Sequence, residues 1–534
     1  KPGDVILVDA SLAADGGVQS QRPDGSVLRS ARKPHPRLGL FSPLQDRTLT
    51  LPSGLEVRTI EEATVSGSDL AQPVDEVRRT QVNGRTTTWH YSAATREHRI
   101  TTPAGRSQAW REDAAGRVVQ QQAGALAAIH YAYDDQGRVV LQTQGSGNDA
   151  RRTQFFYGSD GLLSGITDAL GRSLSLQRDA AGRVVQGLLP GARTIGFGQD
   201  PNGNLVSLTP PGRPAHTIGH DRRDLETHYT PPLLPGVASP QHTKAYNRDK
   251  DLTLWTLADG RSLSLGYDAA SGQLRTLTPG TDGGPPVTLS YHPSGQLASA
   301  GTPEQGLSFS YDGPLPLHDD YSGAVQARLS RRYDADARLA ELTVGGSAVT
   351  LSYDADDLLT QAGPLGLVRD PVNGWLAGIT LGQTTTAISH NPFGEPTLLV
   401  VEAGGNPVYR LELSHDALGR VVATTETVLG QTRWRDYGYD EAGRLATIAS
   451  QGNPLARIGY DANGNRTRLD QQTVAQFDDQ DRLVQQLGVQ FSFNDAGQLR
   501  SRTDASGTTH YRYDLWGRLL EVTRPDGRRI AYVY

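Results

Sequence analysis

The stretches Tyr439-Asp-Glu-Ala-Gly-Arg-Leu445 and Tyr460-Asp-Ala-Asn-Gly-Asn465 decide the fold, because they are two copies of one motif that begin 21 residues apart. A third copy reads Tyr513-Asp-Leu-Trp-Gly-Arg-Leu519. The shorter pattern Asp-x-x-Gly followed by Arg or Asn begins at Asp113, Asp134, Asp168, Asp179, Asp200, Asp416, Asp440, Asp461 and Asp514. Recurrence near a fixed period indicates a repeat architecture in which each copy is one supersecondary unit.

The residues of each copy suit a strand that ends in a tight turn. Asp opens such a turn by accepting a hydrogen bond from a backbone N–H two or three residues on, and Gly supplies the left-handed conformation that the turn needs. Before the turn, Ile458-Gly-Tyr-Asp461 and similar stretches place two side chains on one face of a strand. The residues assigned to this structural repeat are Tyr133, Asp134, Gly137, Arg138, Tyr439, Asp440, Gly443, Arg444, Tyr460, Asp461, Gly464, Tyr513, Asp514, Gly517 and Arg518.

A second turn signal falls near the middle of many copies, as in Thr102-Pro-Ala-Gly-Arg106, so the chain reverses about every ten residues. This rhythm predicts an all-β chain, with strand above about 45% of residues and helix below about 10%. Two strands per copy give on the order of 42 strands, a strip about 200 Å wide at ~4.8 Å per strand. Because sheets rarely exceed about ten strands without curling or closing, the strip is expected to roll up.

Domain boundaries are weakly marked. Residues 1–75 carry turn signals such as Pro23-Asp-Gly25 without the full motif, which predicts an N-terminal β region or degenerate repeats. Residues 76–534 are predicted to form the repeat array. A stretch that we interpret as an insertion between two strands contains Pro231, Pro232, Pro235 and Pro240.

Composition favours a thin wall over a solid core. Hydrophobic residues make up 36% of the chain, which also has 60 glycines and 31 prolines. The 52 basic and 58 acidic residues are interspersed, so no basic run offers a nucleic-acid site, and no apolar stretch approaches the roughly 20 residues of a membrane span. Cysteine and methionine are absent, which excludes thiol chemistry. The chain begins at Lys1, so we expect it to be processed or a fragment of a longer protein.

Candidates for metal binding or catalysis have simpler structural interpretations. His216 and His220 are four residues apart, but His220 stands at the tyrosine position of a repeat. The turn that begins at Asp461 resembles a calcium loop without the spacing and closing Glu that an EF-hand requires. Asp370-Pro371 resembles a self-cleaving Asp-Pro site, yet it falls in the turn register as a longer variant. We therefore predict that the chain is not an enzyme and requires no metal or cofactor.

The repeated unit Tyr-Asp-x-x-Gly-Arg-Leu, over roughly residues 80–534, resembles the RHS/YD repeat. That repeat is shared by bacterial Rhs polymorphic toxins, the C component of Tc toxins, wall-associated bacterial proteins and animal teneurins. The resemblance implies β-hairpins curled into a spiral hollow shell or barrel, which in the toxin branch encloses a C-terminal toxin domain. The core region by which some members release the toxin has no match in this sequence, so no autoproteolytic residue is assigned.

Two functions are compatible with this resemblance. The first is a non-catalytic shell that encapsulates a cargo, normally a C-terminal toxin domain expected to lie outside this chain. The second is a secreted or cell-surface structural protein that binds glycans or a partner, since rows of tyrosines also suit carbohydrate binding. We favour packing between strands as the role of these tyrosines. Expected partners are the protein's own toxin or cargo domain, with a secretion-apparatus protein or a cell-surface glycan as further candidates, and neither nucleic acid nor a membrane span is expected.

Overall fold

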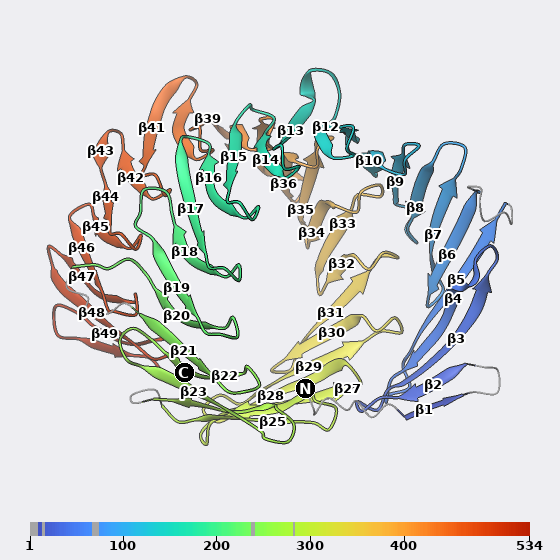
Figure 1. Cartoon of the computed structure of the whole chain (residues 1–534), viewed down its shortest axis with the longest axis horizontal. Helices are drawn as coiled ribbons and strands as arrows, with labels where there is room; N and C mark the ends of the chain where they lie inside the picture. Colours follow the sequence, from blue (N-terminus) through green and yellow to red (C-terminus); the bar gives the residue numbers. More distant parts are fainter. Residues whose placement is uncertain (1–8, 13–16, 67–73, 236–240, 281–283, 534) are drawn as a thin grey trace. The chain divides into compact units, whose positions relative to one another are not determined.

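The computed structural model describes residues 9–12, 17–66, 74–235, 241–280 and 284–533, and fifty strands lie within them (Figure 1). Strand accounts for about 60% of the chain. One short 3₁₀ turn, Gly147–Asp149, is the sole helical segment in the described part of the chain. The predicted all-β class is therefore confirmed.

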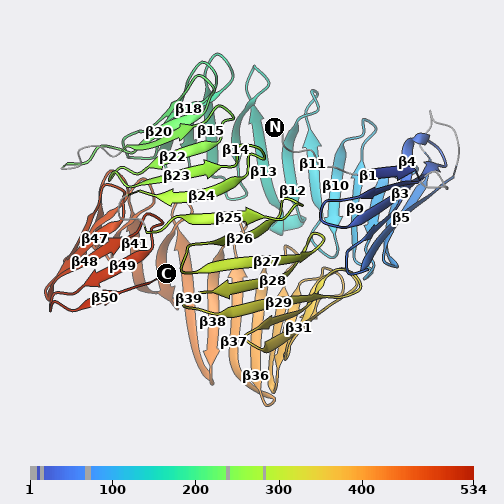
Figure 2. The same ribbon diagram turned by 90° about the horizontal axis from the view of Figure 1, so that it is seen from below.

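The strands follow one another as antiparallel hairpins, because each ladder in the described residues joins a strand to the next one along the chain. For example, β11 (Ile129–Tyr133) pairs with β12 (Val139–Gln144). Figure 2 shows β27 (Gly306–Asp312), β28 (Leu315–Ser322) and β29 (Ala327–Tyr333) lying side by side in the same manner. The turn signals of the sequence thus mark hairpin ends.

The chain divides into two compact units and passes through each of them twice. Unit 1 contains Phe155–Leu289 and Arg435–Tyr534, and unit 2 contains Asp4–Gln154 and Ser290–Trp434. Each unit is therefore assembled from two stretches of hairpins that lie far apart in the sequence.

Few side chains are fully buried, as the lean composition predicts. Eight hydrophobic side chains are buried among the described residues. Three of them, Leu257, Leu263 and Leu515, form a cluster in unit 1 that joins its two stretches of chain. Two sheets packed face to face would bury both inner faces along their whole length. The hairpins within each unit instead form single sheets, and both faces of these sheets stay partly accessible to solvent.

The hairpin ladder continues across residue 75. Strand β5 (Glu56–Val65) pairs with β6 (Glu76–Val82) from Thr59↔Val82 to Val65↔Glu76. The separation of residues 1–75 from the array at 76–534 stays a prediction. No helix in the described ranges is long and apolar enough to cross a bilayer.

The proline-rich stretch after residue 230 is an insertion between paired strands, as predicted. Strands β20 (Glu226–Thr230) and β21 (His242–Tyr246) flank it and pair through Tyr229↔His242. Its residues 231–235 form an irregular loop, whereas Pro240 lies outside the described residues.

Candidate functional site in the repeat turns

Each motif aspartate organises its own turn. At the end of β11, Gly137 N donates to Asp134 O at 3.0 Å, and Asp134 N donates to Arg138 O at 3.0 Å. Asp134 Oδ1 accepts from Gln136 N at 3.0 Å and from Arg138 N at 2.9 Å. The sequence analysis predicted that Asp134 accepts hydrogen bonds, but it expected donors two or three residues further on. The observed donors are the backbone amides two and four residues further on. Gly137 has φ +80°, the left-handed conformation predicted for it.

The motif arginine binds the aspartate of the same turn. Arg138 Nε donates to Asp134 Oδ2 at 2.8 Å. The corresponding Nε–Oδ2 distances are 2.8 Å for Arg444 with Asp440 and 2.6 Å for Arg518 with Asp514. Hydrogen bonds from the backbone and guanidinium of Arg138 lower the pKa of the Asp134 carboxyl group. The Asp134 carboxyl group is therefore held in the charged form.

The motif tyrosine joins one repeat to the preceding one. Tyr133 Oη donates to Val118 O at 2.6 Å, and Tyr460 Oη donates to Leu445 O at 2.9 Å. The guanidinium of Arg444 lies 4.7 Å from the centroid of the Tyr460 ring, a cation–π contact. Because the hydroxyl and the ring are engaged within the wall, these tyrosines support packing and not a sugar-binding row.

Every predicted tyrosine lies at a β-bulge. The register shifts between Ala132 and Tyr133 and in the same way immediately before Tyr439, Tyr460 and Tyr513. A bulge bends its strand and increases the local twist, so each repeat adds curvature at the same point. Sequence reasoning placed the turn correctly but did not find the bulge, which depends on the length of the partner strand.

The predicted residues form four separate turns. Those at 439–444 and 460–464 are neighbours in unit 1, where Arg444 Nη1 donates to Asp461 O at 2.7 Å. Gly443, Gly464 and Gly517 have φ values of +85°, +107° and +79°. The turn at 133–138 belongs to unit 2, and the turn at 513–518 contacts a different stretch of unit 1, described below.

In unit 2, two turns that lie far apart in the sequence dock onto each other. Arg106 Nη2 donates to Asp354 Oδ2 at 2.7 Å, and its Nη1 donates to Asp356 Oδ2 at 2.6 Å. Thr102 Oγ1 and Ala104 N also donate to the Asp356 carboxylate, at 2.7 and 2.8 Å. The Arg106 side chain is 12% exposed, so this ion pair is largely shielded from water. Burial alone would raise the pKa of Asp354, but the hydrogen bonds from Arg106 and from the backbone amides of Leu358 and Asp356, together with the charge of Arg106, outweigh it and lower that pKa.

Similar contacts recur along unit 2. Arg151 Nη1 and Nη2 donate to the two carboxylate oxygens of Glu395 at 2.5 and 2.9 Å, and its guanidinium lies 3.7 Å from the ring centroid of Phe393. Ser53 N and Oγ donate to the Asp312 carboxylate at 2.9 and 2.5 Å. We call these docked turns the seam of the unit.

Unit 1 has a seam of the same kind. Arg213 Nε donates to Asp481 Oδ1 at 2.8 Å, and its Nη2 donates to Asp461 Oδ2 at 2.5 Å. Arg261 Nη1 donates to the backbone carbonyl of Asp514 at 2.6 Å. Across both units, six seam pairs are separated in the sequence by 244, 248, 250, 253, 259 and 268 residues. The chain therefore returns alongside itself at a nearly constant interval.

The sequence analysis missed the seam residues, although one signal was available. Arg106 and Arg213 end turns in which Thr102 and Thr209 stand at the position four residues earlier, where the motif has Asp. An arginine without an aspartate in its own turn is available to bind a carboxylate elsewhere. The sequence does not identify that carboxylate.

Of the rejected chemical candidates, His216, Asp461 and Asp370 have structural partners. His216 lies on strand β19 (His216–His220), and its Nδ1 is 2.7 Å from Tyr229 Oη. Asp461 Oδ2 accepts from Asn465 Nδ2 at 3.0 Å as well as from Arg213. Asp370 N donates to Trp375 O at 2.8 Å, which makes this turn one residue longer than the motif. In the residues that the structure describes, no three His, Asp or Glu side chains are grouped to hold a metal ion.

A family model described as Teneurin YD-shell matches residues 5–534. Teneurin-4 of Mus musculus is 26% identical over 293 residues, which cover 52% of this chain and 10% of Teneurin-4. Double-stranded DNA deaminase toxin A of Burkholderia cenocepacia (strain H111) is 28% identical over 166 residues, which cover 28% of this chain and 11% of that protein. This chain thus spans about a tenth of the length of these relatives.

Among solved structures, one chain of the Tc holotoxin pore of Photorhabdus luminescens aligns with a TM-score of 0.65 at 13% identity. The alignment covers 95% of this chain and 31% of that one. At this identity the likeness shows the fold alone.

Proposed function

Since this chain belongs to the Teneurin YD-shell family, we propose that it is a non-catalytic scaffold whose hairpins wind into a wall that encloses a passenger polypeptide. The passenger proposed is the protein's own C-terminal toxin or cargo domain, outside this chain. Two of the similar proteins have toxin in their names, and that word applies to those proteins. A location outside the producing cell or at its surface is part of the same proposal.

The observation that carries the proposal is the constant sequence interval of the seams. A linear hairpin array would bring together only neighbours in the sequence. Here the seam contacts in the two units join residues that are 244 to 268 positions apart in the sequence. A wall that winds with a period of about 250 residues produces such an interval, because every seam then joins one winding to the next.

The thinness of the wall supports the same function. Single sheets with eight buried hydrophobic side chains among the described residues have no central core of their own. Stability comes instead from the ladders, the turn ion pairs and the seams, which act along the wall. A scaffold of this kind can surround another polypeptide because its stability does not depend on a filled centre.

Small-angle X-ray scattering tests the enclosure. A wall around a void has a pair-distance distribution that peaks beyond half of the largest dimension, and we expect that curve for the parent chain. A distribution that peaks at or below half would contradict the proposal, because it describes a filled or elongated particle.

Protease protection tests the passenger. A small domain with one cleavage site for a sequence-specific protease is appended after Tyr534, and cleavage is compared between the parent array and the double variant Arg106→Gln/Arg213→Gln. We expect slower cleavage in the parent array, because that variant opens the seam of each unit. Equal cleavage rates in the parent, the variant and the isolated passenger would contradict encapsulation.

A further inference from the structure

A notch opens in unit 2 where one strand leaves its neighbour. Strand β4 (Gly39–Thr50) pairs with β5 from Asp46↔Ile60 to Thr50↔Glu56, and the ladder ends there. The preceding half of β4 stays paired with β3 (Val27–His35) alone. At the end of the ladder, Glu61 Oε2 accepts the hydrogen bond of Gln45 N at 2.9 Å, so a side chain replaces the missing backbone partner.

The notch is held open by a buried polar bridge. His35 from β3 and Glu76 from β6 are 2% and 6% exposed, and their Nε2 and Oε1 atoms are 3.1 Å apart. His35 Nδ1 accepts from the backbone amides of Arg37 and Leu38 at 3.2 Å each, which leaves Nε2 as the donor to Glu76. Arg78 Nε donates to the same Glu76 oxygen. The bridge therefore fixes the position of Arg78 at the wall of the notch.

Two rows of side chains line the notch from one face of the sheet. The direct pairs Glu61↔Thr80 and Thr80↔Thr87 make a polar row across β5, β6 and β7 (Arg85–Ser92). Directly opposed residues of paired strands share a face. The second row consists of Arg78, Trp89 and Ile100, joined by the pairs Arg78↔Trp89 and Trp89↔Ile100. The last of these residues belongs to β8 (Glu97–Thr101).

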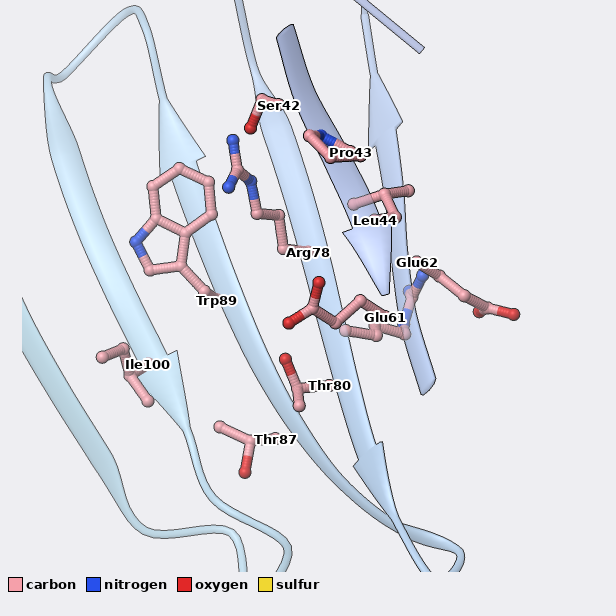
Figure 3. Close-up of a pocket in the computed structure, with 11 residues that line it drawn as sticks. Ser42, Pro43, Leu44, Glu61, Glu62, Arg78, Thr80, Thr87, Trp89 and Ile100 are labelled. Atoms are coloured by element: carbon pink, nitrogen blue, oxygen red, sulfur yellow. The ribbon is translucent and has the colours of Figure 1, made fainter. Parts of the chain in front are cut away.

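Figure 3 shows the side chains of both rows around one pocket, with Ser42, Pro43 and Leu44 of β4 on the opposite wall. The pocket has a volume of about 230 Å³. Glu62 and Arg79 also border it but form a direct pair on the other face of the sheet, where both are exposed. The charged groups that face the pocket are thus the Glu61 carboxylate and the Arg78 guanidinium.

Several polar groups that line the pocket have no hydrogen-bond partner within the described residues. The hydroxyls of Ser42, Thr80 and Thr87 make no hydrogen bond there, and neither does Glu61 Oε1. These groups supply hydrogen-bond donors and acceptors on both walls of the pocket. Ile100, the buried Leu44 and the Trp89 ring, whose centroid lies 5.5 Å from the Arg78 guanidinium, supply apolar surface.

We propose that this notch binds one neutral sugar ring. A pyranose presents an apolar face, which matches the Trp89 and Ile100 side chains, and an edge of hydroxyls, which matches the polar row. The volume lies below the roughly 300–1,000 Å³ of sites for drug-sized ligands, so the occupant is a single ring or the terminal ring of a chain. One carboxylate and one guanidinium leave no net positive charge to attract an acidic sugar. This site is separate from the enclosure function and from the motif tyrosines.

Saturation-transfer NMR with glucose, galactose, mannose and N-acetylglucosamine tests the proposal on the whole chain. At least one of these sugars is expected to receive saturation through its ring protons, with a Kd on the order of millimolar, as suits a small ligand. Thr80→Val removes one hydroxyl at constant shape and is expected to weaken binding about three- to tenfold. Glu61→Gln, which keeps an acceptor for Gln45 N, tests the carboxylate separately.

Thr88→Val is the matched control, because Thr88 neighbours Thr87 on β7 but belongs to the opposite face. It is expected to leave the Kd unchanged, and thermal melts verify that all variants are folded. The proposal is overturned if none of the four sugars binds, or if Thr80→Val and Thr88→Val weaken binding equally. It is also overturned if only sialic acid or N-acetyltryptophanamide binds. Because binding does not require a passenger, failure here is distinguishable from failure of the enclosure function.

Discussion

At Gly443 the backbone φ is +85°, in the region where a side chain with a branched β-carbon is strained. Gly443→Val is therefore expected to lower the free energy of unfolding by roughly 1 to 3 kcal/mol, measured by urea denaturation. Glu441→Val is the control, since Glu441 is exposed in the same turn and its φ is not positive. Equal midpoints for the two variants would show that this turn does not require glycine.

At Tyr460 the hydroxyl donates to Leu445 O, and the Arg444 guanidinium covers the ring. Tyr460→Phe keeps the ring and removes the hydrogen bond, so a loss of about 0.5 to 1.5 kcal/mol in unfolding free energy is expected. Tyr511→Phe is the control, because the Tyr511 hydroxyl makes no hydrogen bond within the described residues. If both variants melt at the parent temperature, the hydroxyl does not stabilise the join between repeats.

On the scale of elements, strands β19 to β21 carry a half-buried row of aromatic rings. Protonation of the two histidines in this row makes the stability of the protein depend on pH. His216 and His242 flank Tyr229, whose ring centroid lies 5.8 and 6.1 Å from theirs. Burial lowers the pKa of both histidines, although the charges of Asp481 and Asp259 partly oppose this effect. Below about pH 6.5 the unfolded chain binds protons more readily than the folded chain, so the free energy of unfolding falls as the pH falls.

Thermal melts at about pH 7.5 and about pH 5.5 measure this effect, since both values lie above the ordinary pKa of aspartate side chains, about 3.9. We expect the parent to lose more melting temperature between the two than His242→Gln, which cannot be protonated there. The same loss in parent and variant would assign the pH dependence to other groups.

On the scale of the whole molecule, the seams decide whether distant stretches of chain stay together. Arg106→Ala leaves two carboxylates, Asp354 and Asp356, without their shared cation. The pair is largely but not fully buried, so the expected cost is about 2 kcal/mol, below the roughly 3 to 5 kcal/mol for breaking a fully buried pair. In this variant, the rate of backbone amide hydrogen exchange is expected to rise in the turns at 102–106 and 354–358.

Arg99→Ala in the same unit is the comparison, because the ion pair of Arg99 with Glu97 is about half exposed and should contribute little. If exchange rises equally in both variants, or in neither, the seam does not hold the two stretches together. If exchange increases in Arg106→Ala alone, the result supports the seam contacts between distant stretches of chain, on which the proposed enclosure depends.

The sequence by itself determined the turns, the strands and the single-sheet character of this protein. Aspartate, glycine and arginine lie within five residues of one another in each motif, so their hydrogen bonds depend on local geometry that the residue types specify. The hydrogen bonds of the motif tyrosines could also be predicted from the sequence, because Tyr460 and Leu445 belong to consecutive repeats.

Only the tertiary structure decided which turns form the seams and where the notch opens. Arg106 could pair with any exposed carboxylate, and the tertiary structure of unit 2 selects Asp354 and Asp356, which are 248 and 250 residues away. The notch likewise depends on where β4 leaves β5, which is set by how β4 pairs with β3 and β5. Local residue types fix a hairpin, but the sum of many small rotations fixes which hairpins meet.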